Sequence, residues 1–141
     1  MTTHQARTQF APATISLPTA DRQRSHLFYG EGLGFATPGE LADDGVPEPV
    51  RVVVNDALWL MLIPTGGFGW VTAGSEVATR GTVECQVGVT VADRSDVDDF
   101  MDVARAAGAE ILSDAQQQGW GYCGVFADPD GHQWMALAEP S

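Results

Sequence analysis

The sequence repeats itself at a fixed offset, and this repeat limits the folds that the chain can adopt. The tripeptide Ala20-Asp21-Arg22 recurs as Ala92-Asp93-Arg94, and Phe28 recurs as Phe100, in both cases 72 residues further on. Each copy falls where a strand-like segment of alternating polarity gives way to a helix-like segment. We therefore expect two similar supersecondary modules within the 141 residues.

The first module is predicted over residues 12–64. A helix should begin after Asp21, a suitable N-cap, continue to Tyr29 and end among glycines. Residues 39–49 are polar and rich in helix and strand breakers, which indicates a loop. Strands are expected over residues 14–19, 50–54 and 57–63.

The second module is predicted over residues 82–138. Its first strand should span residues 83–91, and Ser95 with Asp98 forms an S-x-x-D box at the start of the next helix. Gly108 should end that helix, whose apolar face is formed by Val97, Phe100, Met101, Ala104 and Ala107. Three further strands are expected over residues 110–112, 122–127 and 132–137, the last two joined by the tight turn Asp128-Pro129-Asp130-Gly131.

Two segments lie outside the modules. Residues 1–11 form a polar N-terminal arm that contains His4. Residues 65–81 form a glycine-rich connector that carries Phe68 and Trp70, and we expect these two aromatic residues to act as a lid or as dimer contacts.

Two motifs link the chain to a known family. The pattern D-x-x-x-S-x-x-F-Y-x-x-x-L-G-F begins at Asp21, and G-x-F-x-D-P-D-G-H-x-W begins at Gly124. Together they resemble the vicinal oxygen chelate superfamily, which includes glyoxalase I, bleomycin-resistance proteins and extradiol dioxygenases. The resemblance extends from Thr14 to Leu137. It implies an α+β fold of two βαβββ modules in tandem, which form a cupped mixed sheet around a shared cavity, and it implies a homodimer.

The family resemblance also defines where a metal would bind. In the resembled enzymes each module supplies two ligands, usually His, Gln or Glu, from its first and last strands. The matching positions here are Thr14, Leu60, Gln86 and Met135, where Leu60 follows from aligning Trp59 with Trp134. Of these, Gln86 alone is a usual ligand for the divalent ions of the family. We therefore predict no metal and no other cofactor, unless a divalent metal occupies a displaced site.

The cavity implied by the resemblance should hold a small-molecule ligand. Its predicted walls are Thr14, Ser16, Leu60, Glu84, Gln86, Trp120, Tyr122 and Met135. Glu84 is a weak candidate for a catalytic base, the alternative being an exposed residue at a strand start. The aromatic residues could equally pack in the core or in a dimer contact. His26 is expected at the surface or packed between helix and sheet, and His132 in the turn or at its rim. Cys123 is expected to be a small buried apolar residue, the alternative being a nucleophile.

The charge of the chain limits its partners. Nineteen acidic and seven basic residues give a net charge of −12, which argues against nucleic acid and anionic membranes. The same charge favours solubility or a cationic ligand. The sequence contains no apolar run of transmembrane length and no secretory signal. Cys85 and Cys123 lack metal-type spacing and predict no disulfide framework, so we expect a cytoplasmic protein with reduced thiols.

Three functions remain open at this point. The favoured one is a metal-free protein that binds a small, cationic or aromatic molecule between its modules. The second is a lyase, isomerase or dioxygenase of the same superfamily with a displaced metal site or none. The third is a structural or regulatory dimer whose cavity is closed by side chains.

Overall fold

A computed structural model describes residues 11–139. Residues 1–10 of the predicted arm, His4 among them, therefore lie outside the described residues. The elements are β1 (Ala13–Thr19), α1 (Arg22–Leu27), η1 (Phe28–Gly32), β2 (Val50–Asn55), β3 (Leu58–Pro64), α2 (Thr65–Val71), β4 (Gln86–Val91), α3 (Arg94–Ala106), β5 (Glu110–Gln118), β6 (Gly121–Ala127) and β7 (Gln133–Ala138). None of the helices in this range is long and apolar enough to cross a membrane.

The strands form two mixed sheets, one for each predicted module. The first has the order β1-β3-β2 and the second has the order β4-β7-β6-β5. In both sheets the first strand of the module runs parallel to the last, and the remaining pairs are antiparallel. The first module replaces its remaining strand with an isolated bridge between Ala36 and Val53. The architecture is thus the predicted α+β fold of tandem βαβββ modules.

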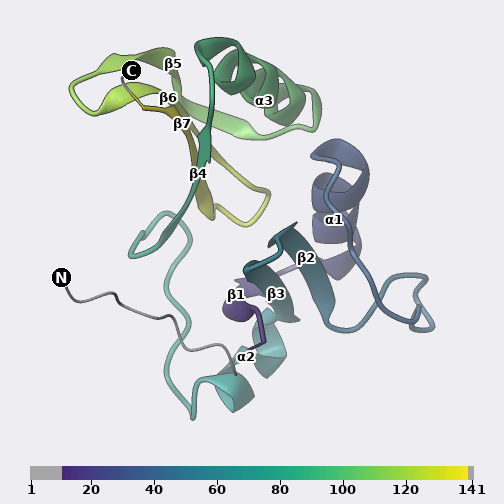
Figure 1. Ribbon diagram of the computed structural model, residues 1–141. Coiled ribbons are helices and arrows are strands. Elements are labelled where there is room, and N and C mark those ends of the chain that lie inside the picture. Colours follow the sequence, from purple (N-terminus) through teal and green to yellow (C-terminus); the bar gives the residue numbers. More distant parts are fainter. Residues whose placement is uncertain (1–10, 140–141) are drawn as a thin grey trace, which may run out of the picture.

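Helices α1 and α3 lie on the same side of their two sheets (Figure 1). Helix α1 packs against the first sheet, α3 packs against the second, and η1 contacts α3. One apolar core lies under the helices and joins the modules, because Phe35 stacks on Trp134 and Phe100 meets the edge of both rings. Apart from the contacts of α2 with β1 and β3, no helix within residues 11–139 packs on the opposite faces of the two sheets. We call these the open faces.

The helix starts follow the repeat. The Asp21 carboxylate accepts a hydrogen bond from the backbone N–H of Arg24 at 3.1 Å, as predicted. The prediction for the second helix was wrong by one half-turn. Asp93, the repeat counterpart of Asp21, is the N-cap, and its backbone N–H donates to the Asp96 carboxylate at 3.1 Å. An aspartate three residues after the cap satisfies this N–H. Ser95 and Asp98 therefore lie inside the helix and do not form its cap.

The first helix ends differently from the prediction. Regular α1 stops at Leu27, and the chain continues through the wider turn η1. At Gly32 in this turn, a side chain would place its Cβ 2.7 Å from the Cβ of Ala107. Glycine therefore allows η1 to approach the end of α3 closely.

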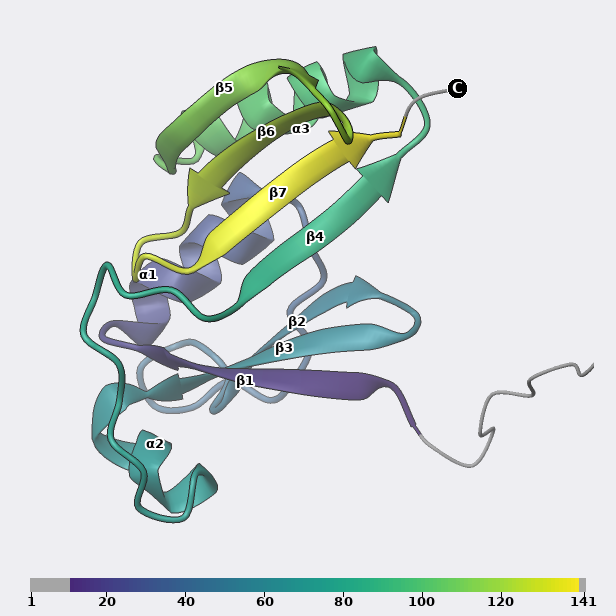
Figure 2. The same ribbon diagram turned by 90° about the vertical axis from the view of Figure 1, so that its left-hand side faces the viewer.

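Three segment boundaries also differ from the sequence analysis. The connector contains a short helix, α2, despite its three glycines, and this helix packs on β1 and β3. Strand β4 begins at Gln86 rather than at residue 83, which leaves Glu84 outside the sheet. Strand β5 extends to Gln118 and curls over the sheet edge through two register shifts (Figure 2).

Candidate functional site

A cavity of about 760 Å³ opens where the two modules meet. Its walls come from the second half of β1, the start of α2, residues 76–85 between α2 and β4, and the turn before β7. Figure 2 shows these segments together at one end of the two sheets. Its volume is within the range of small-molecule sites. Of the predicted wall and lid residues, Ser16, Glu84 and Phe68 line it.

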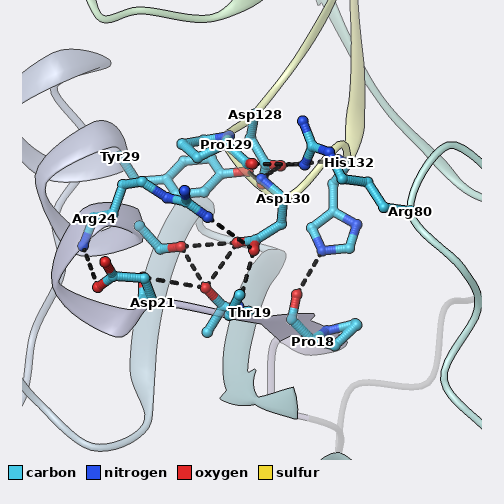
Figure 3. Close-up of polar contacts among 12 residues, drawn as sticks. Pro18, Thr19, Asp21, Arg24, Tyr29, Arg80, Asp128, Pro129, Asp130 and His132 are labelled. Carbon is cyan, nitrogen blue, oxygen red and sulfur yellow. Dashed lines mark hydrogen bonds and ion pairs between the residues drawn. The ribbon is translucent and has the colours of Figure 1, made fainter.

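The turn that forms one wall is fixed by the first module (Figure 3). The Asp130 carboxylate accepts hydrogen bonds from the hydroxyls of Thr19 at 2.7 Å and Ser25 at 3.1 Å, and from the backbone N–H of Ala20 at 2.9 Å. Arg24 adds a longer contact of 3.4 Å. A carboxylate near the C-terminus therefore binds the first strand-to-helix junction of the chain.

A second carboxylate in the same turn is buried. Asp128 accepts a hydrogen bond from the Tyr29 hydroxyl at 2.5 Å and two from backbone N–H groups of the turn, and the Trp134 indole N–H donates to Tyr29 at 3.1 Å. Burial raises the pKa of Asp128 above its usual range. Burial, and then the Asp128 charge, raises the pKa of Tyr29 well above its usual range. We call Thr19, Ser25, Tyr29, Asp128 and Asp130 the junction network.

The junction network explains the two family-like motifs. Ser25 and Tyr29 belong to the first motif, and Asp128, Asp130 and Trp134 belong to the second. The structure brings the motifs into direct contact across about a hundred residues of sequence. Their residues are therefore engaged in holding the modules together. Neither motif contains a local pattern that predicts this contact, and only the presence of both motifs in one chain indicates it.

Two further residues attach to the turn. The His132 imidazole Nε2 lies 2.7 Å from the Pro18 carbonyl oxygen, and Arg80 of the connector donates to the Pro129 carbonyl oxygen at 2.6 Å. The expectation of a turn residue at His132 agrees with this position. Arg80 was not singled out in the sequence, because a carbonyl partner 49 residues away leaves no local pattern.

Within the described part of the chain, one close group of three potential metal ligands exists, namely Asp128, Asp130 and His132. Both carboxylates already accept several hydrogen bonds from protein donors. A cation there would have to displace these donors, and the modules would lose their junction. The donor set therefore does not fit a displaced metal site.

The strand register corrects one predicted metal position. Ile15 pairs with Leu60, whereas Val87, the repeat counterpart of Ile15, pairs with Trp134. The structural counterpart of Trp134 is thus Leu60, and that of Met135 is Met61. Leu60 is 0 % exposed and belongs to the core under α1. Aligning Trp59 with Trp134 was wrong by one residue, which in a strand reverses the face.

The corrected set lies on the open faces. Alternation along the strands places Thr14 and Met61 on the open face of the first sheet, and Gln86 and Met135 on that of the second. The Gln86 side-chain amide donates to the Gln133 amide oxygen at 3.2 Å. One hydroxyl, two thioethers and one amide do not fit Mn²⁺, Fe²⁺, Ni²⁺ or Zn²⁺.

Two predicted wall residues lie elsewhere. The Tyr122 hydroxyl donates to Asp98 of α3 at 2.6 Å, and the Arg94 guanidinium lies 4.7 Å from its ring centre. Tyr122 therefore faces the helix, and its placement in the cavity wall was wrong. Trp120 is 58 % exposed in the turn between β5 and β6, outside the cavity walls. Successive residues of a strand point to opposite faces. An error of one residue near a turn therefore assigns a side chain to the wrong face.

The remaining candidate residues are either exposed to solvent or contact other parts of the protein. Trp70 on α2 is 92 % exposed. Glu84 lines the cavity but is exposed. His26 contacts the Thr37 hydroxyl at 3.1 Å. Both cysteines are free, with Cys123 buried and Cys85 exposed.

Solved structures of other proteins share this fold. A protein from S. aureus described as hypothetical protein SA1046 superposes with a TM-score of 0.76 at 21 % identity, and the match covers 95 % of this chain and 96 % of that one. A glyoxalase-related enzyme from Fulvimarina pelagi gives a TM-score of 0.75 at 27 % identity, with 95 % and 90 % covered. TnmS3, an antibiotic binding protein from Streptomyces sp. CB03234, gives 0.65 at 19 % identity, with 96 % and 100 % covered.

None of the curated proteins matches this chain. A family model does match it, and it describes the Glyoxalase/Bleomycin resistance protein/Dioxygenase superfamily. The match spans residues 11–136, which includes both modules, the connector and both motifs. On this evidence the chain belongs to the glyoxalase/bleomycin resistance protein/dioxygenase superfamily.

Proposed function

We propose that this protein binds a small organic molecule without a metal, at the cavity and along the adjoining open faces. One observation carries the proposal. The four positions that would hold a metal are Thr14, Met61, Gln86 and Met135, yet the cavity beside them has the volume of a ligand site. Binding needs affinity alone, so the loss of metal ligands leaves such a function intact.

The open faces support an apolar, aromatic ligand. Trp59, Met61 and Ile63 of the first sheet and Met135 and Leu137 of the second are only partly buried. Methionine side chains adapt to irregular aromatic shapes. TnmS3 is described as antibiotic binding, which is compatible with this use of the fold. The acidic surface favours the approach of a cationic ligand at low salt.

We further propose that a second copy of the chain covers part of the open faces, giving a homodimer. Partly exposed apolar residues on a sheet face are costly in water, and a partner surface would bury them. The exposed Trp70 is the side chain best suited to anchor such a contact. Free thiols at Cys85 and Cys123 support a reducing, cytoplasmic setting.

No specific contact favours the enzyme alternative. A catalytic base needs a partner or a site that excludes water. Glu84 is exposed and makes no hydrogen bond within residues 11–139. The binding function therefore has the stronger support.

Metal analysis with thermal unfolding tests the proposal. The purified protein, incubated with Mn²⁺, Ni²⁺, Fe²⁺ or Zn²⁺ and then desalted, should retain less than stoichiometric metal by mass spectrometry. A library of aromatic compounds should include members that raise Tm in a concentration-dependent manner, equally with and without EDTA. Stoichiometric metal, or stabilisation that EDTA abolishes, would contradict the proposal.

A matched variant makes the negative result informative. The double substitution Met61→Glu and Met135→Glu restores one carboxylate to each open face beside Thr14 and Gln86. This variant should gain metal affinity if the corrected positions are right. A variant that still binds no metal would show that these four positions do not face one another in the assembled protein.

A further inference from the structure

Six of the seven strands contain only one charged residue among them, and this residue is Arg51 on β2. Strands β1, β2, β3, β4, β6 and β7 contain no other Arg and no Lys, Asp, Glu or His. Arg51 pairs with Met61 across the first sheet, and its neighbours Val50 and Val52 are fully buried on the helix side. Alternation therefore places the Arg51 side chain on the open face, where it is partly buried.

Arg51 also differs from the other arginines of the described residues. Arg22, Arg24 and Arg105 pair with aspartates. Arg94 donates to the Gln117 side chain and Arg80 donates to the Pro129 carbonyl. Arg51 makes no hydrogen bond and no ion pair within residues 11–139. Although the chain has 19 acidic residues, the partly buried Arg51 side chain thus has no acceptor within residues 11–139.

The surroundings of Arg51 are those of a ligand subsite. Across the first sheet, Ser16, Met61 and Arg51 form one row on the open face, and Thr14, Trp59 and Val53 form the next. The Ser16 and Thr14 hydroxyls likewise make no hydrogen bond within the described residues. Two strand spacings, roughly 10 Å, separate the hydroxyls on β1 from the guanidinium on β2. Between them lies an apolar floor that contains Met61 and Trp59.

We infer that Arg51 binds a carboxylate group on an aromatic ligand whose ring lies over Met61 and Trp59. A guanidinium presents a planar fork that matches a carboxylate with two parallel hydrogen bonds. The ring would cover the apolar floor, and Ser16 or Thr14 would bind a polar group at its far end. This inference rests on the proposed small-molecule function and specifies the ligand class.

The net charge of the chain leads to a different expectation, namely a cationic ligand. The two effects act at different ranges. The surface charge acts over about a Debye length and mainly changes the rate of association. Arg51 acts at contact, in a setting partly shielded from water, where a charge-assisted hydrogen bond is worth more than at the surface. The contact with Arg51 therefore determines which charged group the bound ligand carries.

The experiment compares three probes that share one ring system: 2-naphthoate, 2-naphthamide and 2-naphthylmethylammonium. We expect the wild-type protein to bind the carboxylate at least about tenfold more tightly than the amide by calorimetry, as for one charged hydrogen-bonded pair. Arg51→Gln should bring the two affinities to within about twofold, because it weakens binding of the carboxylate much more than binding of the amide. Arg51→Lys should retain part of the preference, because it keeps the charge and loses the fork. The control is Arg105→Gln at an exposed position of α3, which should retain all of the preference.

The outcomes separate this inference from the proposed function. Equal affinities in the wild type, a preference for the ammonium probe, or a carboxylate preference that survives Arg51→Gln would each overturn the inference while leaving ligand binding in place. A shift in sedimentation of Arg51→Gln without a change in probe affinity would assign Arg51 to an acidic group of a second copy, which also overturns it. Failure of every naphthyl probe, with hits elsewhere in the thermal screen, would overturn the inference alone. If the naphthyl probes and the whole thermal screen both fail, the inference and the proposed function are overturned together. Unfolding curves establish that each variant is folded.

Discussion

The hydroxyl of Tyr29 donates to the carboxylate of Asp128 at 2.5 Å, and both side chains are buried. The same hydroxyl accepts from the Trp134 indole at 3.1 Å. Tyr29 thus connects η1 of one module to two residues of the other, within a continuous apolar core.

Removing that hydroxyl should destabilise the protein clearly. Tyr29→Phe leaves the Trp134 N–H without an acceptor and removes one donor from buried Asp128, so we expect a loss of about 2–3 kcal/mol in the free energy of unfolding. Denaturant unfolding measures it. Tyr122→Phe, which removes an exposed hydroxyl bonded to Asp98, is the matched control and should cost about 1 kcal/mol or less. Equal losses for the two variants would contradict the role of the junction network.

The stability of the protein should depend on pH through Asp128. Because burial raises its pKa in the folded protein, the folded state binds a proton more readily than the unfolded state, whose carboxyl pKa is about 3.9. The favourable contribution is present below that value and is lost as pH rises through the raised pKa. The cost of Asp128→Asn should therefore shrink as pH increases across this window. Unfolding curves at several pH values measure this, and a cost that grows with pH would contradict it.

The corrected register predicts opposite consequences for two adjacent residues. Leu60→Ala empties a fully buried position and should cost about 2–5 kcal/mol. Met61→Ala lies on the open face and should cost about 1 kcal/mol or less. Denaturant unfolding distinguishes them, and a larger loss at Met61 would return Leu60 to the ligand-facing side.

The connector should be held at one point. Residues 76–85 make two hydrogen bonds within the described part of the chain, a turn bond from the Thr82 N–H to the Thr79 carbonyl and the bond from Arg80 to Pro129. Arg80→Ala should therefore increase thermolysin cleavage in this segment about fivefold, as for the loss of one hydrogen bond worth about 1 kcal/mol. The global free energy of unfolding should change little. Unaltered cleavage would show that the segment is held by other contacts.

Self-association should depend on Trp70. If a second copy covers this side chain, Trp70→Ser should weaken the dimer about tenfold or more in sedimentation equilibrium. Trp120→Ser removes another exposed tryptophan far along the sequence and should leave the dimer unchanged. A monomeric wild-type protein, or equal effects of both substitutions, would contradict the proposed interface.

The sequence predicted the fold because its signals are local and occur twice. Asp21 and Asp93 mark equivalent helix starts, and the turn at Asp128 to Gly131 carries its own chemistry. Assigning faces was less successful near irregular points. Aligning Trp59 with Trp134 was off by one residue and placed Leu60 on the wrong face. Tyr122, near the start of β6, was assigned to the cavity, although it lies under α3. Periodicity identifies a strand but does not fix its register against a distant partner.

The contacts that define the site were the hardest to foresee. Asp130 binds Thr19 and Ser25 across more than a hundred residues, and such pairs depend on tertiary structure alone. Arg51 was overlooked because a single arginine in an apolar strand matches no motif. Its significance becomes visible only when every other described arginine has an acceptor.

The contact between Asp130 and Thr19 has a consequence for synthesis on the ribosome. Thr19, Ser25 and the N–H of Ala20 emerge first, but their acceptor is made more than a hundred residues later. Until then, the first module lacks the carboxylate that satisfies its strand-to-helix junction. The two halves are related by repetition, yet the strand-to-helix junction of the earlier half gains its protein acceptor only from the later half.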